Sequence, residues 1–153
     1  MAAPFLRTYD SVAEWLKGAV PQAVLLLFVR IVLAGIFWRA GRSKVEEDSW
    51  LTPTDSTREL FHTEYAGVPF PPDIAMVMAI AAEHILPALL IAGLFTRGAA
   101  AGIIGMTLVI QFFVYPDAWW SVHALWVALA AILVMRGGGL LSLDALLLRV
   151  RRP

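Results

Sequence analysis

The chain contains no cysteine, few charged residues and only three histidines, and each shortage excludes a class of protein. Without cysteine there is no disulfide, no thiolate metal site, no covalent haem attachment and no thiol redox relay. Charged residues make up 16% of the chain and their formal charges cancel, so there is no basic excess for binding nucleic acid. Hydrophobic residues make up 59%, which is too apolar for an ordinary soluble domain.

Four apolar runs account for this composition, at residues 22–43, 73–95, 98–115 and 119–136. Each is close to the ~20 residues that a helix needs to cross the hydrocarbon of a membrane. Backbone groups in lipid must be paired within the segment, which makes helices the expected form. The sequence therefore predicts an all-α membrane protein, with a single domain over residues 1–153 folded as a four-transmembrane-helix bundle.

Basic and acidic residues fall on different sides of these spans. Basic residues precede the first span, occupy the turn between the second and third, and continue in the tail 137–153, whereas the long loop 45–72 is acidic. The positive-inside rule therefore predicts cytoplasmic termini and a periplasmic loop 45–72. The residues behind this prediction are Arg7, Lys17, Arg97, Arg136, Arg149, Arg151 and Arg152 on one side, and Glu46, Glu47, Asp48, Asp55, Glu59, Glu64, Asp73 and Asp117 on the other.

Three short amphipathic helices are expected outside the spans. In the loop, Ser56 and Glu59 have the spacing of a capping box. In the tail, Gly137 begins a glycine run that breaks the fourth helix, and Ser142 can cap a helix that lies on the inner leaflet. The apolar faces are Phe5, Leu6, Tyr9, Val12, Trp15 and Leu16 near the N-terminus, Leu60, Phe61 and Tyr65 in a loop helix from about Thr57 to Tyr65, and Leu143, Leu146, Leu147 and Val150 in the tail.

Charged residues inside the spans are the first place to look for function, because each costs roughly 3 kcal/mol to insert into lipid. Arg30 lies in the first span, and Glu83 with His84 lies in the second. Counted from the outer ends at ~1.5 Å per residue, Glu83 is roughly 15 Å deep and Arg30 roughly 20 Å deep. We therefore expect Arg30 and Glu83 to form an ion pair near the midplane.

Helical spacing places further polar side chains above this pair, so the sequence predicts a polar pocket that opens outward with the ion pair as its floor. The alternative is that these polar contacts only tie the helices together, at about 1 kcal/mol each. The candidate ligand-binding or proton-handling residues are Arg30, Glu83, His84, Gln111, Tyr115, His123 and Trp126, with Arg39, Arg42 and Lys44 in a polar outer layer.

Metal and haem sites are not expected. Histidines 62, 84 and 123, with Glu64 and Glu83, are the available metal ligands, and no pair of them shows ligand spacing on one helix face. Haem b needs two opposed histidines at similar depth, and His123 lies too near the outer end to oppose His84.

Several motifs follow one another at regular distances between residues 25 and 148. They are Arg30; Phe37-x3-Gly41-x2-Lys44; Val68–Pro69–Phe70–Pro71; Glu83; the run Leu90 to Arg97; Gln111-x3-Tyr115–Pro116 with Trp119; His123-x2-Trp126; and Gly137-x-Gly139-x-Leu141–Ser142–Leu143–Asp144. In this order they resemble the DoxX family of small four-helix bacterial membrane proteins. The resemblance implies a location in the bacterial inner membrane.

The resemblance also implies a redox context. The family takes its name from a membrane subunit associated with thiosulfate:quinone oxidoreduction, and similar proteins are linked to membrane oxidoreductase complexes and oxidative-stress defence. We therefore expect an accessory subunit of such a complex, not an enzyme alone, with a quinone or another small apolar ligand among its helices. The alternatives are a non-enzymatic scaffold and a helper for small-solute or metal-ion transport. The expected partners are membrane lipid, a protein of the redox complex and further copies of the chain.

Overall fold

The computed structural model describes residues 4–150, and the side chains of residues 7–150, as a helical protein in which the described part holds no strand beyond one isolated bridge between Val45 and Pro53. The helices are α1 (Pro4–Leu16), α2 (Ala19–Arg42), α3 (Asp55–Thr63), α4 (Pro72–Ala92), α5 (Thr96–Phe113), α6 (Ala124–Arg136) and α7 (Leu143–Val150). Four segments are long and apolar enough to cross a membrane: Ala19–Arg42, Pro72–Ala92, Thr96–Phe113 and Pro116–Arg136. The predicted four-helix membrane fold is confirmed.

The fourth span is not one uniform helix. It opens with a 3-10 turn, η1 (Pro116–Ala118), and a π-helical turn, η2 (Trp119–His123), before regular α-helix begins at Ala124. A π turn widens the helix by one residue and shifts the side chains that follow it. The sequence gives no sign of this turn, which ends at His123.

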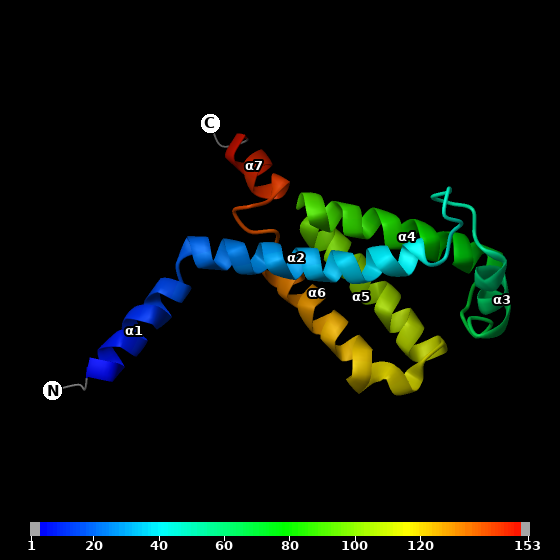
Figure 1. Ribbon diagram of the computed structural model, residues 1–153, viewed down its shortest axis with the longest axis horizontal. Coiled ribbons are helices and arrows are strands. Elements are labelled where there is room, and N and C mark those ends of the chain that lie inside the picture. Colours follow the sequence, from blue (N-terminus) through cyan, green and yellow to red (C-terminus); the bar gives the residue numbers. More distant parts are fainter. Residues whose placement is uncertain (1–3, 151–153) are drawn as a thin grey trace.

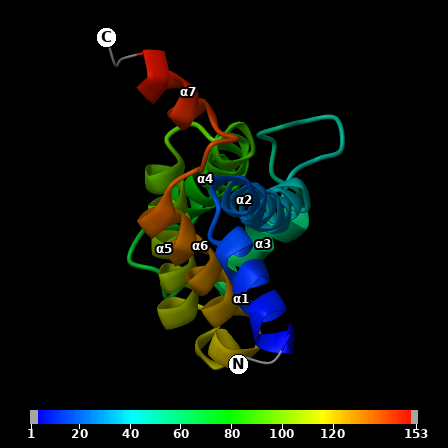
Figure 2. The ribbon, with the colours of Figure 1, turned by 90° about the vertical axis from the view of Figure 1, so that its left-hand side faces the viewer.

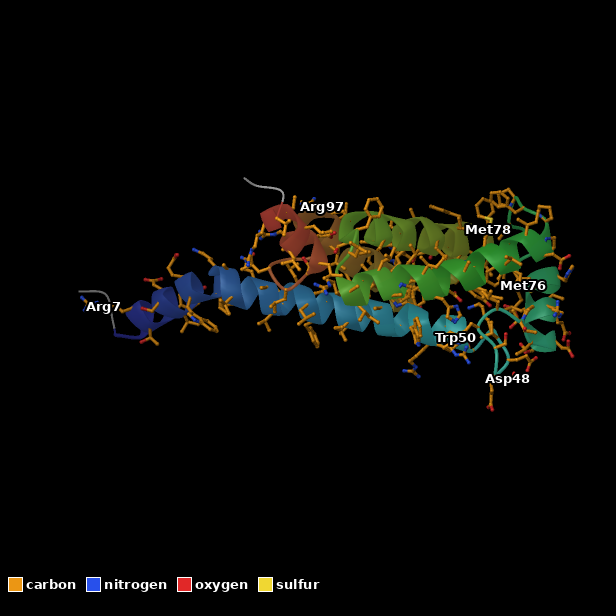
Figure 3. All side chains as sticks on the ribbon, turned by 90° about the horizontal axis from the view of Figure 1, so that it is seen from above. Arg7, Asp48, Trp50, Met76, Met78 and Arg97 are labelled. Atoms are coloured by element: carbon orange, nitrogen blue, oxygen red, sulfur yellow. The ribbon has the colours of Figure 1, made fainter. Side chains whose placement is uncertain are left out.

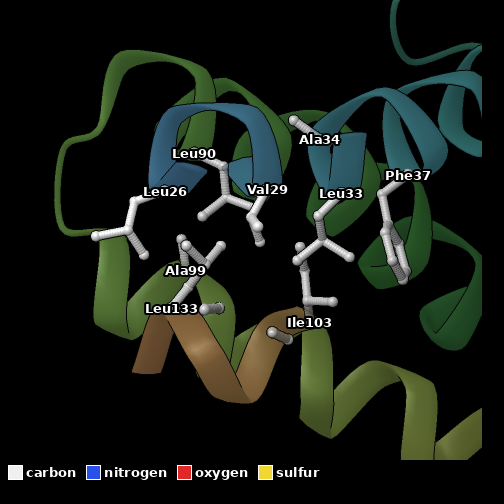
Figure 4. Close-up of a cluster of buried hydrophobic side chains, with 11 residues drawn as sticks. Leu26, Val29, Leu33, Ala34, Phe37, Leu90, Ala99, Ile103 and Leu133 are labelled. Atoms are coloured by element: carbon white, nitrogen blue, oxygen red, sulfur yellow. The ribbon is translucent and has the colours of Figure 1, made fainter. Parts of the chain in front are cut away.

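The four spans form two antiparallel pairs, which share one core. Helix α2 packs along α4, α5 packs along α6, and the second pair crosses the first obliquely (Figures 1 and 2). Small residues of α5 allow the helices to approach closely, as is usual where lipid provides no hydrophobic drive between helices. The buried side chains of this core are Leu26, Val29, Leu33, Ala34, Phe37, Leu90, Ala99, Ala100, Ile103, Ala130 and Leu133 (Figure 4).

Helix α4 continues past the end of α2, and α3 covers the part that extends. Lys44, two residues beyond the end of α2, contacts Glu83 in the middle of α4. The 11 residues of α4 before Glu83, about 16 Å of helix, therefore lie beyond α2. There Phe61 of α3 is buried against Met76 and Ile80 of α4. We call this the α3 end of the molecule and the opposite end the α7 end (Figure 1).

Helix α3 begins two residues earlier than the capping box predicts. Thr54 is its N-cap residue, and its hydroxyl accepts the backbone N–H of Thr57 at 3.2 Å. Ser56 instead exchanges a hydroxyl hydrogen bond with Thr54 at 3.0 Å. Both residues are good N-cap types, and the structure uses the threonine.

Helices α1 and α7 lie at the edge of the bundle and leave apolar faces uncovered (Figure 1). The exposed residues are Tyr9, Val12, Trp15 and Leu16 in α1, and Leu143, Leu146, Leu147 and Val150 in α7. Ser142 caps α7 as predicted, since its hydroxyl accepts the N–H of Ala145 at 3.2 Å. The predicted roles of Phe5, Leu6, Arg151 and Arg152 fall outside the side chains that the structure describes.

Gly93 is the glycine on which the α7 end depends. It ends α4 with φ +67°, and a Cβ there would lie 2.6 Å from Ser142 Cβ and 2.8 Å from Arg30 Cζ. Gly93→Ala should therefore lower stability by more than the roughly 1–2 kcal/mol of the left-handed backbone alone. The measurement is thermal unfolding of the purified protein in detergent.

Gly105→Ala is the matched control, because Gly105 lies inside α5 and a Cβ there meets no atom within 4 Å. Alanine is favoured over glycine in a helix, so this variant should be as stable as the wild type or slightly more stable. Equal unfolding temperatures for the two variants would contradict the role of Gly93.

Candidate functional site

Arg30 does not pair with Glu83, so the predicted ion pair is wrong. Its guanidinium donates four hydrogen bonds to backbone carbonyls: Nε to Leu90 at 2.7 Å, Nη2 to Ile91 at 2.8 Å, and Nη1 to Gly138 and Leu141 at 2.9 and 2.7 Å. Leu90 and Ile91 belong to the last turn of α4, whose carbonyls have no partner within the helix. The buried cation therefore caps α4 and ties it to the segment before α7.

The physical reason for the error is the offset between helices. The depth count assumed that the first and second spans start from one outer plane, but α4 begins well beyond the end of α2. The offset brings Arg30 opposite the end of α4 and moves Glu83 to the level where α2 ends.

Glu83 pairs with Lys44 instead. Lys44 Nζ lies 2.9 Å from Oε1 and 2.8 Å from Oε2 of the carboxylate and also donates to the carbonyl of Ala40 at 3.2 Å. The two side chains are 13% and 5% exposed, so this is a largely buried ion pair. Gly41 makes room for it, because a Cβ there would lie 3.0 Å from Glu83 Cβ.

His84 faces a different set of residues from its neighbour Glu83. Its Nδ1 donates to the carbonyl of Ile80 at 2.8 Å, which leaves Nε2, buried and without a hydrogen-bond partner, as the ring's lone-pair nitrogen. Trp38 and Trp50 pack edge-on at 5.5 and 5.9 Å between ring centres. His84 therefore lies in an aromatic wall and takes no part in the ion pair.

The outer-layer arginines do not enter this site. Arg42 holds the loop that follows α2, donating to the carbonyls of Ser49 at 2.7 Å and Glu47 at 3.1 Å, with its guanidinium 4.9 Å from the centre of the Trp50 ring. Arg39 is exposed and makes no hydrogen bond or ion pair with the described residues. Of the predicted outer layer, only Lys44 reaches a candidate site residue.

Gln111, His123 and Trp126 lie together near the start of the fourth span. Gln111 Oε1 accepts from His123 Nδ1 at 2.7 Å, and its amide donates to the carbonyl of Pro116 at 2.6 Å. The Trp126 ring packs 5.3 Å from His123 and 5.1 Å from Phe37. These bonds join α5 to the irregular start of the fourth span. They therefore fit the alternative in which polar contacts hold the helices together.

Tyr115 faces away from this group, toward α3. Its hydroxyl donates to the Glu64 carboxylate, and its ring lies 6.3 Å from Tyr65. The hydrogen bond to Glu64, with partial burial and the carboxylate charge, raises the pKa of Tyr115 to about 12. Tyr115 therefore remains a protonated donor that fastens α3 to the end of α5.

An apolar pocket of about 250 Å³ lies under α3, between α4 and α5. Glu83 is the one charged residue that lines it. The sequence predicted a pocket with Arg30 and Glu83 as its floor, and of these two only Glu83 lines it. Most of the wall was not predicted, although Phe61 and Tyr65 belong to the apolar face expected for the loop helix. The lining residues are Phe61, Tyr65, Val68, Phe70, Ala75, Met78, Ala79, Ala82, Glu83, Met106, Val109 and Ile110.

No metal centre is built from the described residues: nowhere among them do three or more histidine, aspartate or glutamate side chains gather closely enough to hold an ion. His62 pairs with Asp73 at 3.1 Å, His84 with a backbone carbonyl and His123 with Gln111. The three histidines therefore lie in three separate environments.

The Lys44–Glu83 pair leads to a prediction about stability. Lys44→Met leaves a buried carboxylate without its counterion, which typically costs about 3–5 kcal/mol. The double variant Lys44→Met/Glu83→Leu removes both charges and should recover most of that loss. Chemical or thermal unfolding in detergent measures both effects.

The control is a double-mutant cycle for Arg30→Met and Glu83→Leu, in which the stability of the double variant is compared with the sum of the two single effects. Because these residues do not touch, their effects should add to within about 0.5 kcal/mol. Strong coupling between Arg30 and Glu83, or unchanged stability of Lys44→Met, would contradict this geometry.

Asp144 leads to a prediction about pH. Its carboxylate accepts the N–H groups of Phe95 at 2.7 Å and Thr96 at 2.9 Å, at the start of α5. Burial alone would raise the pKa of Asp144, but these hydrogen bonds and the Arg30 charge outweigh it and lower the pKa below its ordinary value. A lowered pKa gives stability that is present above the unfolded pKa, about 3.9, and lost as the pH falls through the folded value.

Asp144→Asn should accordingly be less stable than the wild type at pH 7, by about 1 kcal/mol, the usual loss at a helix cap. The difference in unfolding temperature between Asp144→Asn and the wild type should become smaller as the pH falls below about 4. The measurement is the unfolding temperature of both proteins as a function of pH. A constant gap over this range would show that the carboxylate charge contributes nothing.

Comparison with known proteins agrees with the membrane fold described above. The family model described as DoxX matches residues 25–116, more than half of the chain. An uncharacterized protein of Haemophilus influenzae is 30% identical over 146 residues, covering 86% of this chain and 88% of its own length. No solved structure matches. The chain belongs to the DoxX family of membrane proteins.

Proposed function

We propose that this protein is an accessory subunit of a membrane redox or oxidative-stress system, and that it holds a quinone or a similar small apolar ligand in the pocket under α3. The observation that carries the proposal is an apolar pocket of about 250 Å³ whose wall contains one buried carboxylate, Glu83. Binding sites for small molecules are mostly apolar cavities with a few well-placed polar groups.

The pocket is reached from the lipid. Met78 and Val109 line it, and both are also exposed on the apolar surface of the spans. A ligand dissolved in the membrane can therefore enter between α4 and α5 without crossing water. The volume suits a single ring, and a hydrocarbon tail can remain in lipid.

Two polar groups in the pocket can bind the oxygens of such a ring. Tyr65 lines it, and its hydroxyl makes no hydrogen bond to any described residue. Burial, together with the nearby Tyr115, Glu83 and Glu64, raises the pKa of Tyr65, so the hydroxyl stays protonated and can donate to a carbonyl. Glu83 can accept from the hydroxyl of the reduced ring, while Lys44 balances its charge.

The chain has no cysteine, so electrons in any redox cycle would travel on the ligand and on a partner protein rather than on thiols of this chain. This favours an accessory role. We place the protein in the bacterial inner membrane with cytoplasmic termini, because the α7 end carries Arg97, Arg136 and Arg149 while the loop at the α3 end is acidic.

A non-enzymatic scaffold is the second candidate, and one observation favours it. The loop after α2 contains Trp50 and Leu51, which are 60% and 71% exposed, as residues of a partner surface would be. Trp50 lies at the α3 end (Figure 3). A scaffold would not respond to quinone. Transport through an Arg30–Glu83 path loses its basis, because these residues lie apart and the core between them is filled by side chains such as Leu33.

Quinone titration tests the first proposal. A short-chain ubiquinone or menaquinone analogue should raise the unfolding temperature of the purified protein in detergent. Tyr65→Phe should weaken binding by roughly fivefold, the value of one hydrogen bond of about 1 kcal/mol. Ala79→Trp, which fills the pocket with an indole ring, should abolish the shift.

Ala88→Trp is the matched control, because Ala88 is exposed on the same helix and does not line the pocket. It should respond to quinone as the wild type does. No shift in the wild type, or an equal shift in Ala79→Trp, would overturn the proposal.

A further inference from the structure

A second hollow, of about 500 Å³, lies at the α7 end, where α5 starts, α6 ends and α7 begins. Arg97 and Arg136 line it from opposite helix ends. This hollow shares no lining residue with the pocket under α3, and Arg97 lies well apart from Met78, which lines that pocket (Figure 3). It is unconnected with the quinone proposal.

Arg97 is only partly engaged by the protein. Its Nη1 donates to the carbonyl of Val134 at 2.6 Å, whereas Nε and Nη2 make no hydrogen bond to described residues. The guanidinium lies over Gly137, where a Cβ would be 3.4 Å from Nε and 3.7 Å from Nη2. The bond to Val134 holds the group in place while two nitrogens remain free to donate.

Arg136 has no acidic partner among the described residues. It is exposed at the last position of α6. Asp144 is the one carboxylate that lines the hollow, and its two oxygens already accept the N–H groups of Phe95 and Thr96. The two arginines therefore outnumber the single acid, and the hollow has a net positive charge.

The rest of the wall is apolar and exposed. Leu94 and Phe95 on one side and Leu147 and Leu148 on the other line the hollow with large uncovered side chains. These residues lie where the spans end, which is the level of lipid headgroups. Two cations above an apolar wall at this depth match a phosphate that carries acyl chains.

We propose that the hollow binds the headgroup of an anionic phospholipid, with the phosphate between Arg97 and Arg136 and the acyl chains along Leu147 and Leu148. The free guanidinium nitrogens of Arg97 supply charge-assisted hydrogen bonds to phosphate oxygens. Asp144 occupies the N–H groups at the start of α5, so the arginines, not the helix end, recognise the anion. The lipid in turn covers the apolar side of α7.

The test is lipid retention and stabilisation in the full-length, delipidated protein. Phosphatidylglycerol added in detergent should raise the unfolding temperature more than phosphatidylcholine does, and native mass spectrometry should show bound phosphatidylglycerol. Arg97→Gln/Arg136→Gln should weaken lipid retention by about tenfold or more, because each basic residue near an anionic headgroup strengthens the electrostatic binding of the lipid. The readout is the lipid-dependent shift, so any basal loss from the Val134 bond does not affect it.

Arg39→Gln/Arg58→Gln is the matched control, because it removes two exposed arginines elsewhere and should retain the lipid as the wild type does. Inorganic phosphate and soluble glycerophosphoglycerol distinguish the source of the anion and should give little stabilisation. An equal effect of phosphate alone, or no difference between phosphatidylglycerol and phosphatidylcholine, would overturn the proposal.

Discussion

The structure depends on one buried cation bound by backbone carbonyls. Arg30 is 1% exposed and has no acidic partner within ion-pair distance among the described residues, and the last carbonyls of α4 lack the amides of a following helical turn. The two groups satisfy each other, because the guanidinium carries five N–H donors and the C-terminal end of the helix has unpaired carbonyls and a partial negative charge. The same group also binds the carbonyls of Gly138 and Leu141, so α2, α4 and the approach to α7 are fixed together.

The hydrogen bonds of Arg30 to the end of α4 set how far α4 is shifted along α2. Because of this shift, the first part of α4 extends beyond α2 at the α3 end. Once Arg30 lies against Leu90 and Ile91, α4 must run past the end of α2. The uncovered part of α4 needs a cover, which α3 supplies through Phe61. The pocket is the space left where this short helix bridges α4 and α5. The site under α3 is thus a consequence of a contact at the far end of the bundle.

Hydropathy predicted the four spans, because it depends on side chains that the sequence states directly. The sequence named Gln111, His123 and Trp126 as candidates, but it did not indicate that Gln111 and His123 would bond to each other. The partners of Arg30 could not be predicted, since carbonyl acceptors have no sequence signature and every residue carries one. The pairing of Glu83 required the helix offset, which hydropathy does not give. The sequence predicted Lys44 in an outer layer with Arg39 and Arg42, whereas in the structure Lys44 is the counterion of Glu83.

The position of Lys44 in the chain links the pocket to the loop, because Lys44 belongs to the loop and pairs with Glu83 in the pocket wall. Lys44 lies after α2, in a segment whose backbone is held by Thr54 N–H bonding to its carbonyl at 3.1 Å and by Arg42 on the carbonyls beyond it. The counterion of Glu83 is therefore supplied by the loop and not by the spans. Any displacement of this loop leaves an unpaired carboxylate in the pocket wall, so the loop conformation and the polarity of the pocket cannot change independently.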